Sequence, residues 1–533
     1  MKNKSIPHAL LAGIFLLALV SCRPAAKAPA HAVRLSDSCF MEEASVDQMR
    51  RGYERGDYTV SAVVKGYLER IEALDRGGPR LNAILCVNPD ALKIADDLDR
   101  ERAAGKVRGP LHGIPVILKD NIDAVGGMPT TAGATALRDS FPRQDSWVAR
   151  KLRAAGAVIL AKANLSEWAN FRANLSSSGW SGIGGQTRNP YMLDRNPCGS
   201  SSGSGVAVAA NLCVLAIGTE TNGSIVCPAN NNGIVGLKPT VGLVSRSGII
   251  PISFSQDTAG PMGRTVADVA ICLDALVGVD PADAKTRPSL GKYRTDYEKF
   301  LKADGLKGER IGLLKGSAGF HPRVAVLFDQ AAAFLKSQGA AIIEVNSPKE
   351  SGMEEDSFQV MLYEFKDGLN RYFAGLAPGG PVKDLEGLIQ FNKTDPVELR
   401  YFDQDVLEMA QKKGGLKSPE YRKALAAMLK AAREDGIDRI MDRYKLDAIM
   451  APTGAPAWKT DLVDGDHFLG GSSSLAAIAG YPSITVPMGF IDELPVGVSF
   501  FGRAWSEPVL LEIAYAYEQG TKHRRPPKFL ASD

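Results

Sequence analysis

The sequence predicts an α/β fold, with one large domain built around a β-sheet that helices cover. Short apolar runs typical of buried strands alternate along the chain with segments of helical periodicity, which is the pattern of a layered α/β architecture. Strand patterns also occur on both sides of a long helical segment at about residues 354–444, so we expect both sets of strands to share one sheet. The chain has 533 residues, 45% of them hydrophobic, and can therefore bury the core that such a domain requires.

The first half of the chain supplies the clearest alternation. Helical periodicity covers residues 45–75, with Thr59 as a candidate N-cap, and a second helix is expected over 90–104, after an apolar run at 81–87. The run 114–118 predicts a buried strand that ends at Lys119. A helix over 145–155 and a strand over 157–160 complete this part.

In the second half, strand and helix patterns alternate again on both sides of the helical segment. The patterns predict helices over 265–277, 324–337 and 507–519, and strands over 310–314, 341–345, 448–450, 483–486 and 497–501. Charge rises and helical periodicity dominates between residues 354 and 444, so this stretch is interpreted as a helical insertion that caps the sheet.

Residues 198–240 form the centre around which the chain is organised. Two Gly/Ser-rich turns flank an apolar segment, 206–217, which predicts a short helix followed by a strand. Two ordinary surface loops would explain the turns, but flexible linkers lack this apolar content. An active site is the more specific interpretation, because glycines allow the backbone to approach a ligand closely and serines supply nucleophiles.

The N-terminus predicts export. Residues 1–21 combine Lys2 and Lys4 with an apolar run, a pattern typical of a secretory signal peptide and too short for a membrane span. The sequence Leu-Val-Ser-Cys ending at Cys22 resembles a bacterial lipobox, which implies lipidation of Cys22 and a tether over residues 22–40 before a domain at 41–533. The expected location is periplasmic or cell-envelope, with membrane contact only through this anchor. A plain signal peptide cleaved nearby is the alternative.

Charge and cysteine content exclude several classes of protein. The chain has 63 basic and 60 acidic residues and no long basic run, so we expect no nucleic-acid partner. Six cysteines follow Cys22 without the spacing of a metal cluster, and one or two disulfides among them are left open. We find no pattern for a metal site or an organic cofactor. The sequence does not indicate an oligomeric state.

A hydrolytic serine needs a base, and histidine is the usual one. The histidines within the domain, His112, His321, His467 and His523, stand alone or in a basic tail and are interpreted as structural. Residues 199–203 match the G-x-S-x-G pattern of a nucleophile elbow, but no buried strand precedes them, so we discount the match.

Lys119 is the other candidate base. It ends an apolar strand, where burial disfavours the ammonium and would lower its pKa from about 10.4 toward neutrality. A lysine that merely extends its amine to solvent from the strand end is the ordinary alternative. The combination of Lys119 with Ser200 and Ser224 overturns that alternative.

These three residues lie in GIPVILKDNID, CGSSSGSG and GTETNGSIVCPA, and with GIVGLKPT and SFSQDTAGPMGRTVADVA they resemble the amidase signature family in the same order. The resemblance implies a single α/β domain around a large, mixed and twisted sheet. It also implies that Ser224 is the acyl-forming nucleophile, that Ser200 is a bridging serine after a cis peptide, and that Lys119 is the ultimate base. The backbone N–H groups of Thr221, Asn222, Gly223 and Ser224 would hold the oxyanion.

Within the family, the motifs look most similar to those of bacterial peptide amidases, which implies a small amide or peptide-amide substrate. The chain departs from the commoner pattern at Cys198, Glu220 and Asn222, and a positive φ at Asn222 would preserve the turn. It also has Val226 and Cys227 where relatives that handle carboxylates carry Arg, which disfavours small anionic substrates.

Three alternative functions stay open at this point. Hydrolysis of other acyl or aryl amides would use the same residues. The A-type subunit of tRNA-dependent amidotransferases shares them too, but a secreted chain would meet no tRNA or ATP. A lipoprotein that binds peptides without catalysis is a different kind of alternative, which the intact set of Lys119, Ser200 and Ser224 disfavours.

Overall fold

The computed structural model describes residues 1, 41–348 and 352–532, and within it residues 41–532 belong to one compact unit built on an 11-stranded β-sheet. The predicted signal peptide, the lipidation site at Cys22 and the tether lie outside the described residues, apart from Met1. No helix in the described part of the chain has the length and apolar character needed to cross a membrane.

The sheet is mixed. Its strands, in spatial order, are β1 (Ile84–Val87), β3 (Val158–Ala163), β2 (Pro115–Lys119), β6 (Leu215–Glu220), β8 (Thr258–Gly263), β7 (Val235–Lys238), β12 (Ser483–Ile491), β13 (Leu494–Phe501), β11 (Ala448–Pro452), β9 (Arg310–Lys315) and β10 (Ala341–Asn346). The pairs β2–β3, β2–β6, β9–β10 and β9–β11 are parallel, and the other neighbouring pairs are antiparallel. A separate hairpin joins β4 (Trp180–Ser181) to β5 (Gly185–Gln186).

Helices surround this sheet. They are α1 (Val46–Arg55), α2 (Val60–Arg70), α3 (Ala91–Ala103), α4 (Trp147–Ala154), α5 (Ser202–Ala209), α6 (Val226–Asn231), α7 (Val266–Leu276), α8 (Pro322–Ser337), α9 (Met353–Gly375), α10 (Leu385–Thr394), α11 (Asp405–Gln411), α12 (Pro419–Ala432), α13 (Asp438–Tyr444), α14 (Ser474–Ala479) and α15 (Glu507–Thr521). Thr59 caps α2, as predicted, because its side chain accepts a hydrogen bond from Ala62 N.

The predicted fold class, one α/β domain around a large mixed sheet covered by helices, is confirmed. Strands β7 and β8 were not predicted. β8 reads Thr-Ala-Gly-Pro-Met-Gly, a composition that strands ordinarily avoid, and yet it lies between β6 and β7 with Pro261 paired to Ile217. Burial on both faces and pairing with two neighbours therefore outweigh local propensity there.

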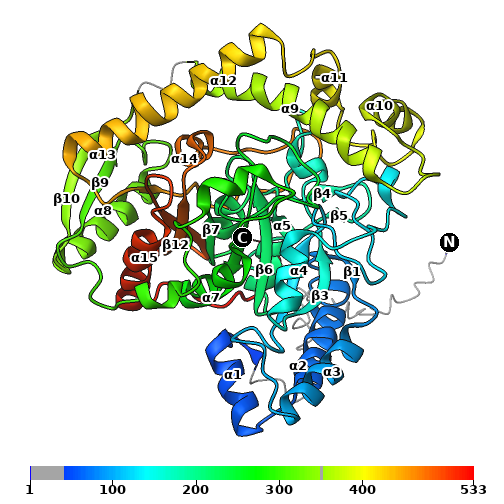
Figure 1. The fold of residues 1–533 in the computed structure, drawn as a ribbon, viewed down its shortest axis with the longest axis horizontal. Helices are drawn as coiled ribbons and strands as arrows, with labels where there is room; N and C mark the ends of the chain where they lie inside the picture. The colour runs from blue at the N-terminus through cyan, green and yellow to red at the C-terminus, as the bar shows by residue number, and fades with distance from the viewer. Residues whose placement is uncertain (2–40, 349–351, 533) are drawn as a thin grey trace. The chain divides into compact units, whose positions relative to one another are not determined.

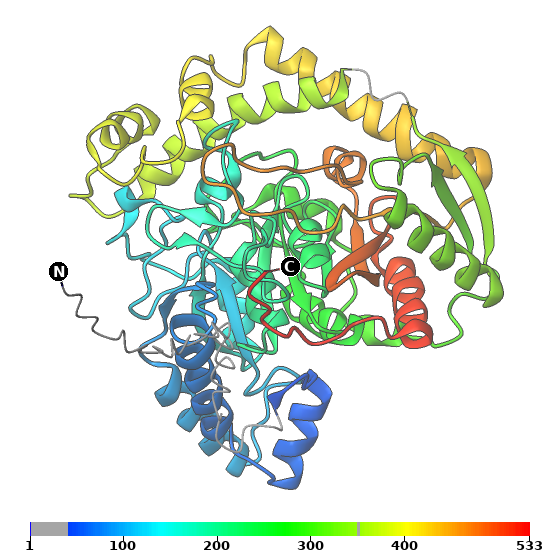
Figure 2. The same ribbon diagram turned by 180° about the vertical axis from the view of Figure 1, so that it is seen from behind.

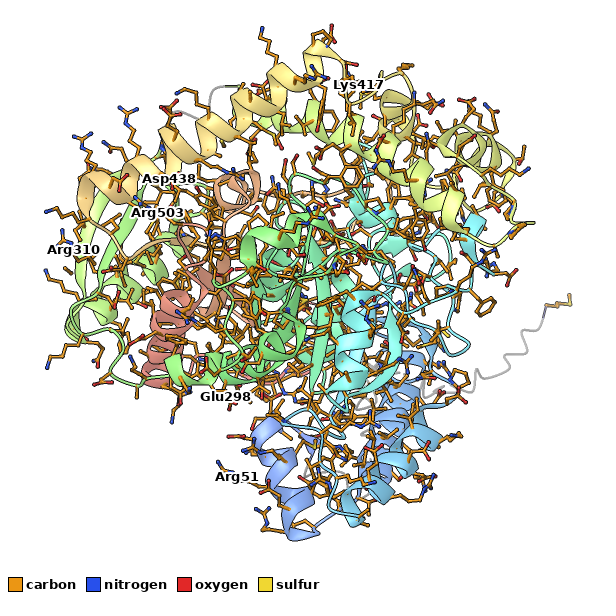
Figure 3. All side chains as sticks on the ribbon, viewed as in Figure 1. Arg51, Glu298, Arg310, Lys417, Asp438 and Arg503 are labelled. Atoms are coloured by element: carbon orange, nitrogen blue, oxygen red, sulfur yellow. A yellow bond between two sulfur atoms is a disulfide. The ribbon has the colours of Figure 1, made fainter. Side chains whose placement is uncertain are left out.

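The helical segment between β10 and β11 lies along one side of the sheet. In Figures 1 and 2, α9 and α12 run beside one another as an arc over the central strands. The far end of the segment is tied to the sheet at α13, where Arg503 Nε lies 3.8 Å from Asp438 Oδ1 and Arg310 Nε donates to the carbonyl of Lys445 at 2.9 Å. Figure 3 shows Arg310, Asp438 and Arg503 together at that end.

The centre of the sheet determines where the candidate catalytic residues lie. Strands β2 and β6 are adjacent and parallel, so their carboxyl ends meet at the same edge. Both strands are buried along their whole length, which fits their continuous apolar runs. Lys119 is the last residue of β2, and Glu220 ends β6 immediately before the turn that carries Ser224.

Candidate active site

The structure brings Lys119, Ser200 and Ser224 to one end of the central strands. Ser200 lies two residues before α5, and Ser224 occupies the turn between β6 and α6. The two serine loops are joined directly, because the N–H of Ser201 donates to the carbonyl of Ser224 at 3.2 Å. The Gly199–Ser200 peptide bond is cis, as the family resemblance implied.

Lys119 makes the closest side-chain contact in this group. Its Nζ lies 2.7 Å from Ser200 Oγ, and the two residues are 0% and 1% exposed. Burial lowers the pKa of Lys119 to about 7, against the opposing charges of Asp257 and Glu220, which raise it. Lys119 is therefore a lysine that can lose its proton near neutral pH while in hydrogen-bond contact with Ser200.

Thr219, for which the sequence motifs predict no role, orients this amine. Lys119 Nζ donates to the Thr219 carbonyl at 3.2 Å and to Thr219 Oγ1 at 2.8 Å, and Asn121 Nδ2 donates to the same hydroxyl at 3.0 Å. A neutral amine has two N–H bonds and one lone pair. When both N–H bonds point at Thr219, the lone pair faces Ser200 Oγ, which is the arrangement a base requires.

The turn that carries Ser224 is held by Glu220, whose carboxylate accepts three backbone hydrogen bonds. Gly223 N donates to Oε1 at 2.9 Å, and Ile225 N and Val226 N donate to Oε2 at 2.8 and 3.1 Å. The expectation of four oxyanion donors changes accordingly, because the Gly223 N–H is committed to Glu220. The N–H groups of Thr221, Asn222 and Ser224 are the remaining candidates.

Asn222 also behaves differently from the expectation. The positive φ in this turn is at Gly223, with a value of 81°, and Asn222 does not adopt one. The Asn222 side chain instead fixes the turn from outside: Ser473 Oγ donates to its Oδ1 at 2.7 Å, and its Nδ2 donates to Ser474 Oγ at 3.2 Å. The turn therefore packs against the segment that leads into α14.

A disulfide joins the two serine loops. Cys198, two residues before Ser200, is bonded to Cys227, three residues after Ser224. The sequence left the pairing open, and the structure pairs these two cysteines while Cys86, Cys213 and Cys272 are free thiols. Cys39 lies outside the described residues. The bond ties the backbone before the candidate bridging serine to the helix after the candidate nucleophile.

Replacing both Cys198 and Cys227 with serine is expected to lower the free energy of unfolding by roughly 2–4 kcal/mol, because the link closes a loop of 29 residues in the unfolded chain. Activity is expected to fall as well, since the two loops lose their shared restraint. Thermal unfolding and ammonia release, each with and without a phosphine reductant, measure both effects. Cys86→Ser, at a half-buried free thiol, is the matched control and should change neither. An unchanged unfolding curve for the double variant would contradict the expectation.

A cavity of about 380 Å³ opens beside these residues, between α9 and the segment 246–258. Its lining is mixed: Asn121, Thr219 and Thr221 contribute polar groups, and Ile250, Ile252, Phe254 and Tyr372 contribute apolar and aromatic surface. Four charged residues line it as well, namely Arg246, Asp257, Asp283 and Arg371. Ala169 also lines the cavity, from a turn in which Trp168, Ala169 and Asn170 all have positive φ. The cavity therefore reaches Thr219, which binds the Lys119 amine, and Thr221, the first residue of the turn that carries Ser224.

Three of the histidines considered as bases, and the buried Lys238, have structural partners. The His112 ring nitrogens contact Leu98 O and Arg108 N, His321 caps α8, and His467 pairs with Asp461. Lys238 is buried in β7 and donates to the carbonyl of Pro239. No group of three or more His, Cys, Asp or Glu side chains within the described ranges could hold a metal ion.

Comparison with known proteins places these motifs in one family. The family model described as Amidase matches residues 62–511. The chain is 40% identical to a probable amidase of Arabidopsis thaliana, with 94% of each covered. It is 35% identical to a putative amidase of Schizosaccharomyces pombe, with 92% of this chain and 87% of that protein covered.

Among solved structures, the native peptide amidase from Stenotrophomonas maltophilia is 52% identical, with a TM-score of 0.87 and coverage of 91% of this chain and 99% of that one. A peptide amidase in complex with the competitive inhibitor chymostatin gives the same identity and coverage and a TM-score of 0.88. The chain therefore belongs to the amidase family and is an amide-hydrolysing enzyme.

Proposed function

We propose that this enzyme removes the C-terminal amide from peptides, giving a free carboxylic acid and ammonia, with Ser224 as nucleophile, Ser200 as proton bridge and Lys119 as base. The observation that carries the mechanism is the 2.7 Å separation of Lys119 Nζ and Ser200 Oγ in a buried position, where the pKa of the lysine is lowered to about 7. A neutral Lys119 can accept a proton from Ser200, and Ser200 in turn from Ser224.

Each step of the reaction uses these groups. Ser224 Oγ attacks the amide carbonyl while its proton passes to Ser200 and the proton of Ser200 passes to Lys119. The N–H groups of Thr221, Asn222 and Ser224 hold the oxyanion, and one such donor typically contributes about 3–4 kcal/mol. The C–N bond then breaks as the nitrogen takes the proton back through Ser200, and ammonia leaves. Water hydrolyses the acyl-enzyme through the same relay.

Three observations support a peptide amide as the substrate. The identity to peptide amidases is 52% over nearly the whole of their chains. The positions after the nucleophile, Val226 and Cys227, carry no cation, and Cys227 is consumed in a disulfide, so the turn lacks the charge that would pair with a small anionic substrate. The cavity beside Thr221 offers apolar and aromatic surface to the group that the amide is attached to.

A panel of amides tests this substrate class. We expect ammonia release from dipeptide and tripeptide amides at a higher kcat/KM than from a fatty amide, an aryl amide or free glutamine. The Ser224→Ala protein, prepared in the same way, is the control for contaminating amidases and should release none. Ammonia release from the fatty or aryl amide alone would overturn the peptide-amide assignment and leave the chain an amidase of another substrate class.

We also propose that the protein is exported and anchored to the membrane by a lipid on Cys22, as the lipobox pattern indicates. Mass spectrometry of the mature protein from a bacterial host should find a lipidated N-terminal Cys22. Cys22→Ala should yield protein that is no longer extracted with the membrane fraction, while its activity is unchanged. An unmodified N-terminus downstream of Cys22 would overturn the anchor.

A further inference from the structure

We infer that helix α9 positions the Ser224 turn through two separate chains of hydrogen bonds that meet at Thr221, so that Ser357 and Glu364 of this helix are positioning residues for the reaction. This inference rests on the proposed function, because it assigns to the turn the role of holding the nucleophile and the oxyanion. It extends that function to a helix of the segment between β10 and β11, which contributes no strand to the sheet.

The first chain runs through Gln256. Ser357 Oγ donates to Gln256 Oε1 at 2.8 Å, and Gln256 Nε2 donates to the carbonyl of Thr221 at 3.2 Å. All three side chains are buried. A backbone carbonyl only accepts, so the amide nitrogen of Gln256 must face Thr221 and its oxygen must face Ser357. The hydroxyl of Ser357 thereby fixes which way the Gln256 amide points.

The second chain runs through Glu364. Its buried carboxylate accepts from Ser253 Oγ at 2.6 Å, from Ser255 N at 3.0 Å and from Ser255 Oγ at 2.7 Å, and Tyr421 Oη of α12 donates to it at 2.7 Å. Glu364 therefore fastens the loop at residues 253–255 to both α9 and α12.

Asp257 passes this restraint on to the turn. Its Oδ2 accepts from Ile252 N and Ser253 N, both at 2.8 Å, which fixes the carboxylate to the loop that Glu364 holds. Its Oδ1 accepts from Thr221 Oγ1 at 2.6 Å. Thr221 is thus held at its carbonyl by Gln256 and at its hydroxyl by Asp257, two consecutive residues with separate attachments to α9.

The geometry of α9 suits this role. Ser357 and Glu364 are seven residues apart, which is two helical turns, so they project from the same face of the helix. In Figure 1, α9 runs over the ends of the central green strands, which include β6 and β7. A helix of 23 residues is a stiff element, and two attachments along it resist rotation as well as translation of the loop.

Apolar packing accompanies these bonds, because Ile250 and Ile252 share a buried cluster with Leu362, Phe365 and Leu369 of α9. Thr221, Ile252, Phe254 and Asp257 also line the cavity of about 380 Å³ that lies between α9 and the segment 246–258. The two hydrogen-bond chains therefore restrain Thr221, in addition to the bonds by which Glu220 and Asn222 hold the rest of the turn. A misplacement of about 1 Å in such a group can cost on the order of 10²-fold in rate.

The test is a set of variants assayed for kcat and KM with one peptide amide. Ser357→Ala and Gln256→Ala should each lower kcat about 10-fold or more, with KM nearly unchanged. The double variant should be no slower than the slower single, because both interrupt one chain. Ser357→Thr, which keeps the hydroxyl, should retain most of kcat. Glu364→Gln, which weakens the second chain, should also lower kcat. Glu355→Gln, on an exposed part of α9, is its matched control and should behave as the unaltered protein.

Combining Ser357→Ala with Glu364→Gln interrupts both chains, so the two losses in kcat should multiply. A rise in KM at constant kcat, or a lower melting temperature at constant kcat, would overturn the inference and leave the proposed function intact. So would losses for Ser357→Ala and Gln256→Ala that multiply. Absence of ammonia release by the unaltered protein from every amide would overturn the proposed function, and this inference with it.

Discussion

Replacing Lys119 with alanine is expected to lower kcat/KM by roughly 10²–10⁴-fold and to remove the acidic limb of its pH profile. Burial lowers the pKa of Lys119 to about 7, so the unaltered enzyme should lose activity below that pH as the amine takes up the proton that prevents it from acting as a base. Above pH 7 the amine is neutral and the rate should reach a plateau. Steady-state ammonia release between pH 5 and 9 checks both statements.

Two further lysine variants make this result specific. Lys119→Arg keeps a positive donor near Ser200 but cannot be deprotonated, so it should be as inactive as the alanine variant. Lys238 is the matched control, since it is also buried with a pKa lowered to about 8, but its amine donates to the carbonyl of Pro239. Lys238→Met should keep the limb near pH 7. A Lys119→Ala enzyme that retains the limb and a near-normal rate would place the base elsewhere.

Substitutions of the two serines are expected to have different effects on turnover and on covalent labelling. Ser224→Ala removes the oxygen that would carry the acyl group, so turnover and covalent labelling by a fluorophosphonate should disappear together. Ser200→Ala keeps the nucleophile but removes its route to Lys119, so turnover should fall by roughly 10²–10⁴-fold while slow labelling persists at Ser224. Labelling at an unchanged rate in Ser200→Ala would argue against the relay.

The combination of Lys119→Ala with Ser200→Ala tests whether the two residues act as one unit. Their side chains are 2.7 Å apart, so removal of either one should already break the relay. The double variant should then cost far less than the product of the single losses. Losses that multiply would mean that Lys119 and Ser200 act independently. Thermal unfolding of each variant separates loss of function from loss of structure.

The fold was predictable where apolar runs follow the period of the element they form. The run that ends at Lys119 predicted β2, and the helical periodicity after residue 354 predicted helices where α9 to α13 are found. The central strand β8 was not predictable, because two glycines and Pro261 give it no strand signal. Its position depends on pairing with β6 and β7, which no local pattern reports.

The candidate active site was also predictable only in part. Lys119, Ser200 and Ser224 were identified by motifs that resemble those of a known family, and the structure brings them together. Thr219, Glu220 and Asp257 support them through contacts that only the folded chain creates, so their roles could not be read from the motifs. The Cys198–Cys227 pairing was equally hidden, because six cysteines allow many pairings and spacing alone does not choose among them.

The disulfide has a practical consequence for anyone who labels this enzyme covalently. Trypsin finds no cleavage site between Arg195 and Arg246, since the one lysine in that stretch, Lys238, precedes a proline. Both serines and both bonded cysteines therefore leave the protein in a single peptide that is closed into a ring by the Cys198–Cys227 bond. Fragmentation inside a ring releases no sequence ions, so the peptide must be reduced and its thiols blocked before a mass spectrum can distinguish an adduct on Ser200 from one on Ser224.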